Sequence, residues 1–141
     1  MLSEIYKKTS NPLNIRYNPK NKWIGQTGEY KGFCVFKNKV YGLRAAILLI
    51  NTYRKKGFDT IEKIIPRFAP PCENDTSAYL EYVKQRYFNI IGSYDVRSRR
   101  GICVLVCLLA FYETGLSLTY EYVNQVYSYI TYEKGYCKKG A

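Results

Sequence analysis

The sequence predicts an α+β fold that is mainly α: a helical domain with a small β-hairpin wing and a buried central helix. Three observations support this prediction. Apolar residues recur with helical spacing from Tyr41 onward, and two short runs of aromatic and β-branched residues precede that region. An eleven-residue apolar run at 102–112 lies inside the helical region. A helix that is apolar on every side is expected to be buried on every side.

The chain of 141 residues has the length of one domain with its own core, so we expect a single domain spanning 1–141. Within it we expect an N-terminal loop and β-wing at 11–37 and a helical body at 40–132. The last segment, 133–141, is rich in lysine and glycine and is expected to form a flexible tail.

The wing is predicted by the runs "KWIGQ" and "GFCVF", which the segment "TGEYK" separates. Two short strand-like runs around a glycine-containing segment are typical of a β-hairpin. We therefore expect Gly28, Glu29 and Tyr30 near the hairpin tip.

Capping residues and prolines set the expected boundaries of the first body helices. The first helix is expected to begin near Tyr41 and to end at Gly57, with Leu43 and Ile47 on its buried face. The run "DTIEKIIPRF" is expected to form a short helix that breaks near Pro66.

The stretch "RFAPPCENDTSAYLEYV" raises a question, because acidic and amide groups stand together after two prolines. Asp75 or Thr76 can cap the N-terminus of a helix that ends at Gly92. Glu73 has no such structural role, so it pairs with a basic residue or faces a cleft. We expect a helix start first, with Glu73 as the chemical candidate in the cluster.

The last two helices are predicted around the apolar run. Ser98 is expected to begin the central helix, and Gly115 is expected to end it. Thr119 is expected to begin a final amphipathic helix.

The formal net charge of +11 predicts a polyanionic partner, which is nucleic acid, an anionic membrane surface or an acidic cell-wall polymer. The basic residues are scattered and no basic helix suited to a DNA groove is apparent, so nucleic acid is the third of the functions considered. The sixteen tyrosines suit surfaces that stack on sugars or bases, or reflect an A/T-rich genome.

The cysteines and the N-terminal residues indicate the cellular compartment in which the protein is made. The odd number of cysteines favours reduced thiols, and the absence of histidine argues against a zinc site. The cysteines are Cys34, Cys72, Cys103, Cys107 and Cys137. The N-terminus has no hydrophobic signal core, and the apolar run is too short to cross a bilayer. We expect synthesis in a cytoplasm without a signal peptide; the resemblance described below implies that this is the cytoplasm of a bacterial host.

Glu113 is the leading catalytic candidate because it directly follows the apolar run, in "LLAFYETGLS". Low-dielectric surroundings and the negative end of a helix dipole both oppose ionisation of a carboxyl group. A carboxylic acid that stays protonated near neutral pH is what a glycosidic oxygen needs as a general acid. The alternative is that Glu113 emerges into solvent where the helix ends.

Glu29 is the second candidate, because a wing folded over a helix end can bring a second carboxylate across a cleft. A separation of roughly 5 to 9 Å between the two carboxyl groups fits glycoside hydrolysis. Glu29 is otherwise an exposed hairpin residue. Without histidine no Ser-His-Asp or Cys-His device is possible, and no GxGxxG or P-loop pattern is present. We expect no cofactor and no metal.

The segments "NPLNIRY", "WIGQTG", "GFCVF", "YGLRAA", "TIEKIIPRFAPPCENDT" and "YETG" resemble a family of phage and prophage proteins usually described as virion structural proteins. The family's typical segments are NNPGNIR, WxG, GxFxxF, GIRA, TIxxIIxRWAPPxENDT and ENG. The resemblance covers residues 11–115. The sequence departs from the family pattern at four positions: Leu13 for glycine, Val40 for glutamate, Phe68 for tryptophan and Thr114 for asparagine.

A second resemblance is to lysozyme-like peptidoglycan glucosaminidases, which carry E-S-G at a helix end, then N-N-L-F-G-I-K, then T-x-E in a β-wing. Residues 11–17 are similar to the N-N-L-F-G-I-K element, and Thr27-Gly28-Glu29 matches T-x-E. Glu113 stands in "ETG" at the other end of the chain. The resemblance therefore implies a circularly permuted lysozyme-like domain.

These resemblances imply a phage-related protein that binds or cleaves the glycan strand of the bacterial cell wall. Glu113 is the expected general acid, Glu29 stabilises the oxocarbenium-like charge or activates water, and Glu73 is held in reserve. Five residues are expected to bind substrate or shape its cleft: Asn11, Asn14, Arg16, Trp23 and Asn74. The rival hypothesis is a non-enzymatic virion protein that packs against other phage proteins.

Overall fold

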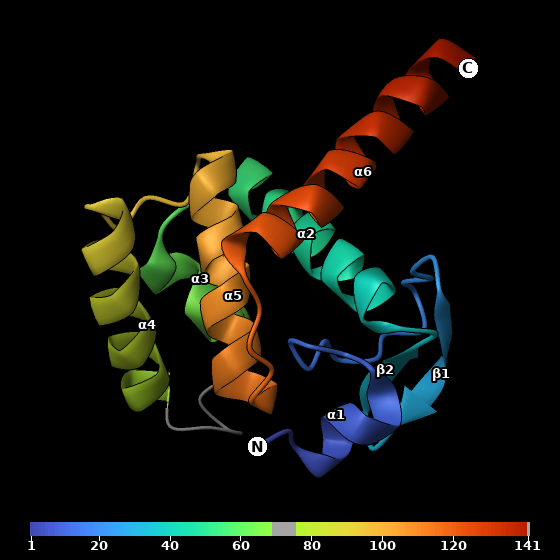
Figure 1. Ribbon diagram of the computed structural model, residues 1–141, viewed down its shortest axis with the longest axis horizontal. Coiled ribbons are helices and arrows are strands. Elements are labelled where there is room, and N and C mark those ends of the chain that lie inside the picture. Colours follow the sequence, from blue (N-terminus) through green and yellow to red (C-terminus); the bar gives the residue numbers. More distant parts are fainter. Residues whose placement is uncertain (69–75, 141) are drawn as a thin grey trace.

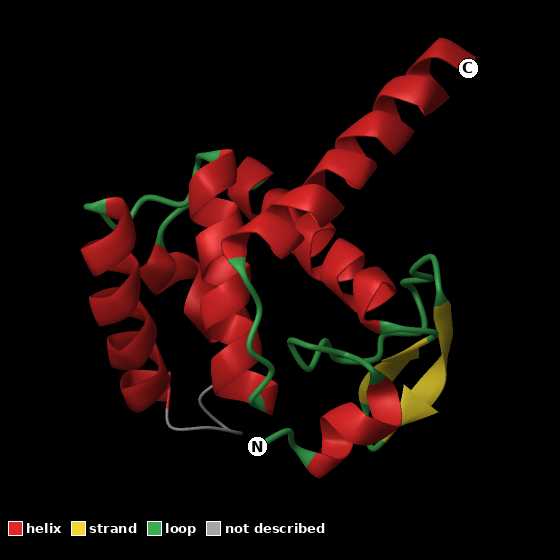
Figure 2. Ribbon diagram, viewed as in Figure 1, coloured by secondary structure: helices red, strands yellow, loops and turns green. Residues whose placement is uncertain are grey.

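Six helices and a two-stranded sheet make up the described part of the chain in the computed structural model (Figure 1; Figure 2). The structure describes residues 1–68 and 76–140, with side chains as far as 133. The fold class expected from the sequence is confirmed. The elements are α1 (Glu4–Thr9), β1 (Gln26–Tyr30), β2 (Phe33–Phe36), α2 (Lys39–Lys55), α3 (Ile61–Phe68), α4 (Thr76–Ile91), α5 (Arg99–Thr114) and α6 (Tyr120–Gly140).

Helix α5 lies in the middle of the helical body, where α2, α4 and α6 all pack against it (Figure 1). Its residues 101–106 are buried, and so are Leu109 and Ala110. The expectation that the whole run is buried is wrong for the last turn, where Phe111 is 49% exposed and Tyr112 39%. Helices α2, α4 and α6 cover most of α5, and in its last turn Phe111 and Tyr112 keep part of their surface exposed.

One cluster of buried apolar side chains joins the N-terminal loop, β2 and helices α2 to α6. Leu43 and Ile47 of α2 belong to it with no exposed surface, as the helical spacing predicts. The hairpin is thereby attached to the helical body through Phe36 and Cys34 of β2, which are also buried.

The hairpin turns at Lys31 and Gly32, not at the residues expected from the sequence. Both have positive φ, 51° and 87°, which is the geometry of a two-residue turn whose twist matches the strands. Glu29 therefore lies within β1, opposite Cys34 of β2. Gly32 supplies the left-handed conformation that the turn requires.

Helix boundaries follow the caps. Ser98 accepts a hydrogen bond from the Gly101 amide at 2.9 Å, and Gly115 ends α5 in a left-handed conformation, so both expected caps are confirmed. Helix α2 begins earlier than expected, because the Asn38 side chain accepts from the amides of Val40 and Tyr41.

Two segments are more helical than expected. Pro66 does not break α3, which continues to Phe68; the proline lies in the last turn, where its missing N–H removes one helical hydrogen bond, to the Glu62 carbonyl. Helix α6 continues to Gly140, through most of the segment expected to form a tail, and projects from the body (Figure 1).

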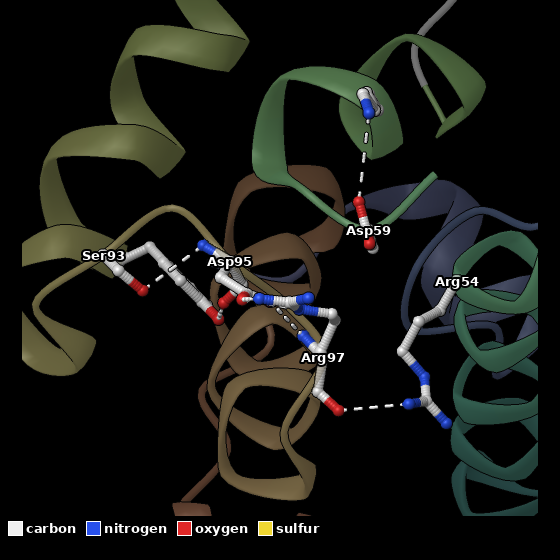
Figure 3. Close-up of polar contacts among 7 residues, drawn as sticks. Arg54, Asp59, Ser93, Asp95 and Arg97 are labelled. Atoms are coloured by element: carbon white, nitrogen blue, oxygen red, sulfur yellow. Dashed lines mark hydrogen bonds and ion pairs between the residues drawn. The ribbon is translucent and has the colours of Figure 1, made fainter. Parts of the chain in front are cut away.

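The loop between α4 and α5 is fixed by polar contacts (Figure 3). The Asp95 carboxylate accepts hydrogen bonds from the amide and guanidinium of Arg97, each at 2.7 Å. The Arg97 carbonyl in turn accepts from Arg54 of α2 at 3.1 Å. The backbone of this loop also pairs with residues 59–61, since the Val96 amide donates to the Asp59 carbonyl at 2.9 Å. These contacts set where α5 begins.

Candidate functional site

The C-terminal end of α5 is held by the N-terminal segment of the chain. The Thr114 hydroxyl is buried and lies 3.0 Å from the Pro12 carbonyl oxygen. The Ser3 amide donates to the Thr114 carbonyl at 2.9 Å. The end of the central helix is therefore fixed against a loop that precedes it by about a hundred residues.

Glu113 lies at this junction and is half-buried. The side-chain amide nitrogen of Asn14 is 3.3 Å from Glu113 Oε1 and 3.4 Å from the Glu113 carbonyl oxygen. Asn14 has a positive φ of 52°, a conformation that asparagine adopts more readily than most residues. The structure thus brings together two residues that the sequence proposes separately, one as the acid and one as a cleft residue.

Tyr79 of α4 is a third member of the site, and sequence patterns alone gave no sign of it. Its ring is fully buried and stacks on Tyr112 with 4.0 Å between ring centroids. Burial raises the pKa of Tyr79 well above its usual value, and the Glu113 carboxylate beside it raises that pKa further. The phenol therefore stays protonated next to Glu113, although its oxygen has no partner in good hydrogen-bond geometry among the described residues.

Asn11 supports the site from within and is fully buried. Its side-chain nitrogen donates to the carbonyls of Ile15 and Cys34, at 3.0 and 2.9 Å, and its oxygen accepts from the Ile15 amide at 3.0 Å. These bonds tie the N-terminal loop to β2. Asn11 therefore fixes the start of the loop that carries Asn14 and Arg16, and both atoms of its amide group are hydrogen-bonded within the fold.

Arg16 and Trp23 belong to the same N-terminal loop. Arg16 is exposed, its backbone pairs with Phe33 of β2, and its guanidinium lies 4.5 Å from the centroid of the Phe33 ring. Trp23 is half-buried and packs against the hydrophobic core. Both residues line a cavity of about 180 Å³ that Asn14 also lines.

Glu29 is exposed, and its carboxylate is directed at its own hairpin turn. Oε2 accepts a hydrogen bond from the Gly32 amide at 2.5 Å. Among the described residues no hydrogen bond joins Glu29 to Glu113. The N-terminal loop bonds to β2, the strand paired with β1, and separately to α5. Glu73 and Asn74 lie outside the described residues.

The segment 16–39, which contains the hairpin, carries much of the positive charge and is called the basic segment below. It holds six basic side chains and one acidic one, Glu29. All six are exposed: Arg16, Lys20, Lys22, Lys31, Lys37 and Lys39. The net charge of this segment is therefore +5, out of +11 for the whole chain.

The described thiols are not activated. Burial raises the pKa of Cys34, Cys103 and Cys107 to about 11, so each is a neutral thiol near pH 7. Within residues 1–68 and 76–133, no group of three or more cysteine, aspartate or glutamate side chains is placed to hold a metal ion. None of the described helices combines the length and the apolar character needed to span a bilayer.

Comparison with known proteins gives one informative similarity. The chain is 37% identical over 84 residues to Protein P5 of Pseudoalteromonas phage PM2. The alignment covers 56% of this chain and 52% of Protein P5, so the chain spans about half the length of that curated relative. No family model matches the chain. The protein is thus similar to a phage protein, as the first resemblance implies.

Proposed function

We propose that this protein acts at the bacterial cell wall during a phage cycle, where it binds the peptidoglycan glycan strand and cleaves it as a glycoside hydrolase or lytic transglycosylase. One observation carries the proposal: Asn14 holds the carboxyl group of Glu113 at the end of a buried helix. A carboxyl group that is half-buried, oriented by an amide and next to a neutral phenol suits a general acid.

In the proposed mechanism Glu113 protonates the glycosidic oxygen, and its proton leaves with the departing sugar. Asn14 donates a hydrogen bond to the carboxylate and so fixes its direction. Glu29 is proposed to stabilise the oxocarbenium-like charge or to activate water. For either role its carboxylate must leave its hydrogen bond with the Gly32 amide and turn toward the bound sugar. Glu73 remains the alternative second carboxylate.

The basic segment gives the protein a means of staying at its substrate. The six exposed cations of this segment attract anionic cell-wall polymers over a distance of about one Debye length, roughly 8 Å at physiological salt. The same charge fits DNA, and aromatic residues such as Tyr17, Trp23 and Tyr30 stand between the basic ones, but the segment forms a loop and a hairpin and no basic helix. DNA binding is therefore the third hypothesis, and its mark is a steep loss of affinity with salt.

The test of this function uses purified sacculi. Incubation with the wild-type protein is expected to release soluble sugar fragments, measured as new reducing ends or anhydro ends, and to leave protein bound to the insoluble wall. Binding without release favours a recognition module. If the protein neither binds the wall nor releases fragments, the proposal is contradicted.

A second function, a non-enzymatic virion protein, is favoured by the similarity to a phage protein. In that case the Glu113 junction is a packing feature and the exposed end of α5 contacts other phage proteins. This hypothesis expects an inert wild-type protein whose Glu113→Gln variant differs from it only in stability.

A further inference from the structure

A second cationic surface surrounds the C-terminal end of α2. Lys39, the last residue of the basic segment, begins this helix, and Lys55 ends it. At a rise of about 1.5 Å per residue, the two ends of a 17-residue helix lie roughly 24 Å apart. The segments 53–67 and 93–100 meet at the far end. The first holds five basic and two acidic side chains, a net charge of +3, and the second holds three basic and one acidic, a net charge of +2.

Hydrogen bonds join these two segments, which together are called the α2-end surface below. The Ile61 amide donates to the Tyr94 carbonyl at 3.0 Å. On the α2 side, the Arg54 guanidinium donates to the Arg97 carbonyl at 3.1 Å (Figure 3). Cations that are about forty positions apart in the sequence are therefore held on one surface.

The three acidic side chains of the α2-end surface are each paired with a cation. Three exposed cations have no such pairing: among the described residues, no carboxylate forms an ion pair with Lys55, Lys56 or Arg67. The surface therefore keeps positive charge for an anionic partner. The pairs are Asp59 with Lys63, Glu62 with Lys84 and Asp95 with Arg97, at 4.0, 3.3 and 2.5 Å.

A cavity of about 550 Å³ lies within this surface, in the size range of roughly 300 to 1,000 Å³ that is usual for ligand pockets. The Arg67 guanidinium lies over the Phe58 ring, with 3.8 Å from its central carbon to the ring centroid. The Tyr53 ring is held edge-on to Phe68, with 5.9 Å between centroids. The cavity thus presents planar groups beside cations. Its lining residues are Tyr53, Phe58, Glu62, Lys63, Pro66 and Arg67.

We propose that the α2-end surface binds single-stranded nucleic acid. Phosphates of the strand lie against Lys55 and Lys56, and one base enters the cavity and stacks on the exposed guanidinium of Arg67. Glu62 and Lys63 offer an acceptor and a donor to the edge of that base. A positively charged track with planar stacking groups is how proteins bind single strands without a sequence preference.

The planar groups favour this ligand over other polyanions. A lipid headgroup or an acidic peptide pairs with the three cations but has no aromatic face to place against Arg67 and Phe58. A base inside a duplex is already stacked on its neighbours, so it cannot enter the cavity without being extruded. A single strand uses both the charge and the stack.

This inference does not depend on cleavage at Glu113. It also differs from the DNA hypothesis above, which rests on the charge of the basic segment. The two surfaces make different predictions, because a strand bound at the far end of α2 contacts Lys55 and Lys56, whereas a strand on the hairpin contacts Lys20 and Lys22.

The experiment measures fluorescence anisotropy of a labelled oligothymidylate of about 20 nucleotides, long enough to exceed the usual site of about 4 to 16 nucleotides. An abasic oligomer of equal length is the comparison, because it has the same backbone and charge but no bases. We expect the wild-type protein to bind the oligothymidylate at least about tenfold more tightly, since stacking of even one base provides that factor. Equal binding of the two oligomers, or binding of neither, overturns the inference. Vesicles of phosphatidylglycerol that compete better, per phosphate, than unlabelled oligothymidylate assign the surface to a membrane and also overturn it.

The dependence on salt locates the strand. Lys55→Ala/Lys56→Ala removes two phosphate contacts, so the slope of log affinity against log salt is expected to fall by about 1.4. Lys7→Ala/Lys8→Ala is the matched control, because it removes the same charge from two exposed residues of α1, and it is expected to keep the wild-type slope. Equal slopes in the two variants, or a fall in Lys20→Ala/Lys22→Ala and not in Lys55→Ala/Lys56→Ala, contradict the inference.

Arg67→Lys separates stacking from charge, since lysine keeps the cation and lacks the plane. The variant is expected to keep the salt slope of the wild type and to reduce the preference for oligothymidylate over the abasic oligomer to less than about threefold. Circular dichroism checks that the variant is folded. An unchanged preference in the folded variant removes Arg67 from the stack and refutes the proposed binding mode.

Discussion

The amide nitrogen of Asn14 lies 3.3 Å from Oε1 of Glu113, although the two residues are 99 positions apart in the chain. This contact joins the N-terminal loop to the end of the buried helix α5. It places the leading candidate acid in a defined orientation, and the first prediction below addresses it directly.

Asn14→Asp is expected to set two carboxyl groups side by side. Aspartate also tolerates the positive φ at this position, so the fold is retained. Repulsion raises the pKa of the pair, and stability relative to the wild type is expected to fall as pH rises through that range. Urea denaturation at pH 3 and pH 7 measures the difference; a shift of one pKa unit corresponds to about 1.4 kcal/mol. An equal effect at both pH values contradicts the contact.

Two substitutions of Tyr79 distinguish the contribution of its ring to stability from that of its hydroxyl group. Tyr79→Phe keeps the stack on Tyr112 and removes a buried oxygen that lacks a well-formed hydrogen bond, so a change below about 1 kcal/mol in the free energy of unfolding is expected. Tyr79→Leu shrinks a fully buried aromatic side chain and is expected to cost about 2 to 4 kcal/mol. Chemical denaturation of both variants checks this. A large loss in Tyr79→Phe shows instead that the hydroxyl bonds Glu113 strongly.

Gly42 of α2 permits the close approach of the N-terminal loop. A Cβ atom there would lie 2.5 Å from Pro12 Cδ and 2.9 Å from the Ser10 carbonyl oxygen. Gly42→Ala is therefore expected to destabilise by about 1 to 3 kcal/mol, despite the higher helix propensity of alanine. Gly28→Ala is the matched control, because nothing lies within 4 Å of its added methyl group. Equal thermal shifts in the two variants refute the close contact.

Asp95 gives the fold a small dependence on acid. Hydrogen bonds from Arg97 hold the pKa of this carboxyl group below its usual 3.8 (Figure 3). A carboxyl group whose pKa is lower in the folded state stabilises the fold at pH values above its pKa in the unfolded chain. This stabilisation is lost as pH falls through the pKa of the folded state. Because the pair is exposed, the effect is expected to be small. Thermal unfolding between pH 2 and pH 6 should show a weaker acid dependence in Asp95→Asn than in the wild type.

Local signals in the sequence predict much of the fold. Ser98 and Gly115 bound α5 because a serine cap and a left-handed glycine act within a few residues of the helix end. The hairpin tip was placed wrongly, because the strand-like runs alone do not show which residues adopt positive φ; Lys31 does so here. The exposure of Phe111 was also unexpected, since an apolar run does not reveal how far its neighbours extend.

The site depends on contacts that no local pattern contains. Glu113 and Asn14 were each proposed from the sequence, but their contact spans most of the chain and requires the folded N-terminal loop. Tyr79 was missed because an amphipathic helix predicts which residues are buried and not which polar group they meet. The clustering of charge in the basic segment follows from the hairpin, which brings Lys31 and Lys37 into the same small unit as Arg16.

The most direct test of the central claim is the rate at which sacculi release soluble glycan in the presence of Glu113→Gln and of Glu133→Gln. Glu133 has an exposed side chain that forms an ion pair with the half-buried Arg44 at 2.9 Å, and it serves as the matched control. The account predicts a loss of at least about a hundredfold for Glu113→Gln, with an unchanged fold by circular dichroism, and a wild-type rate for Glu133→Gln. A wild-type rate in Glu113→Gln would contradict it.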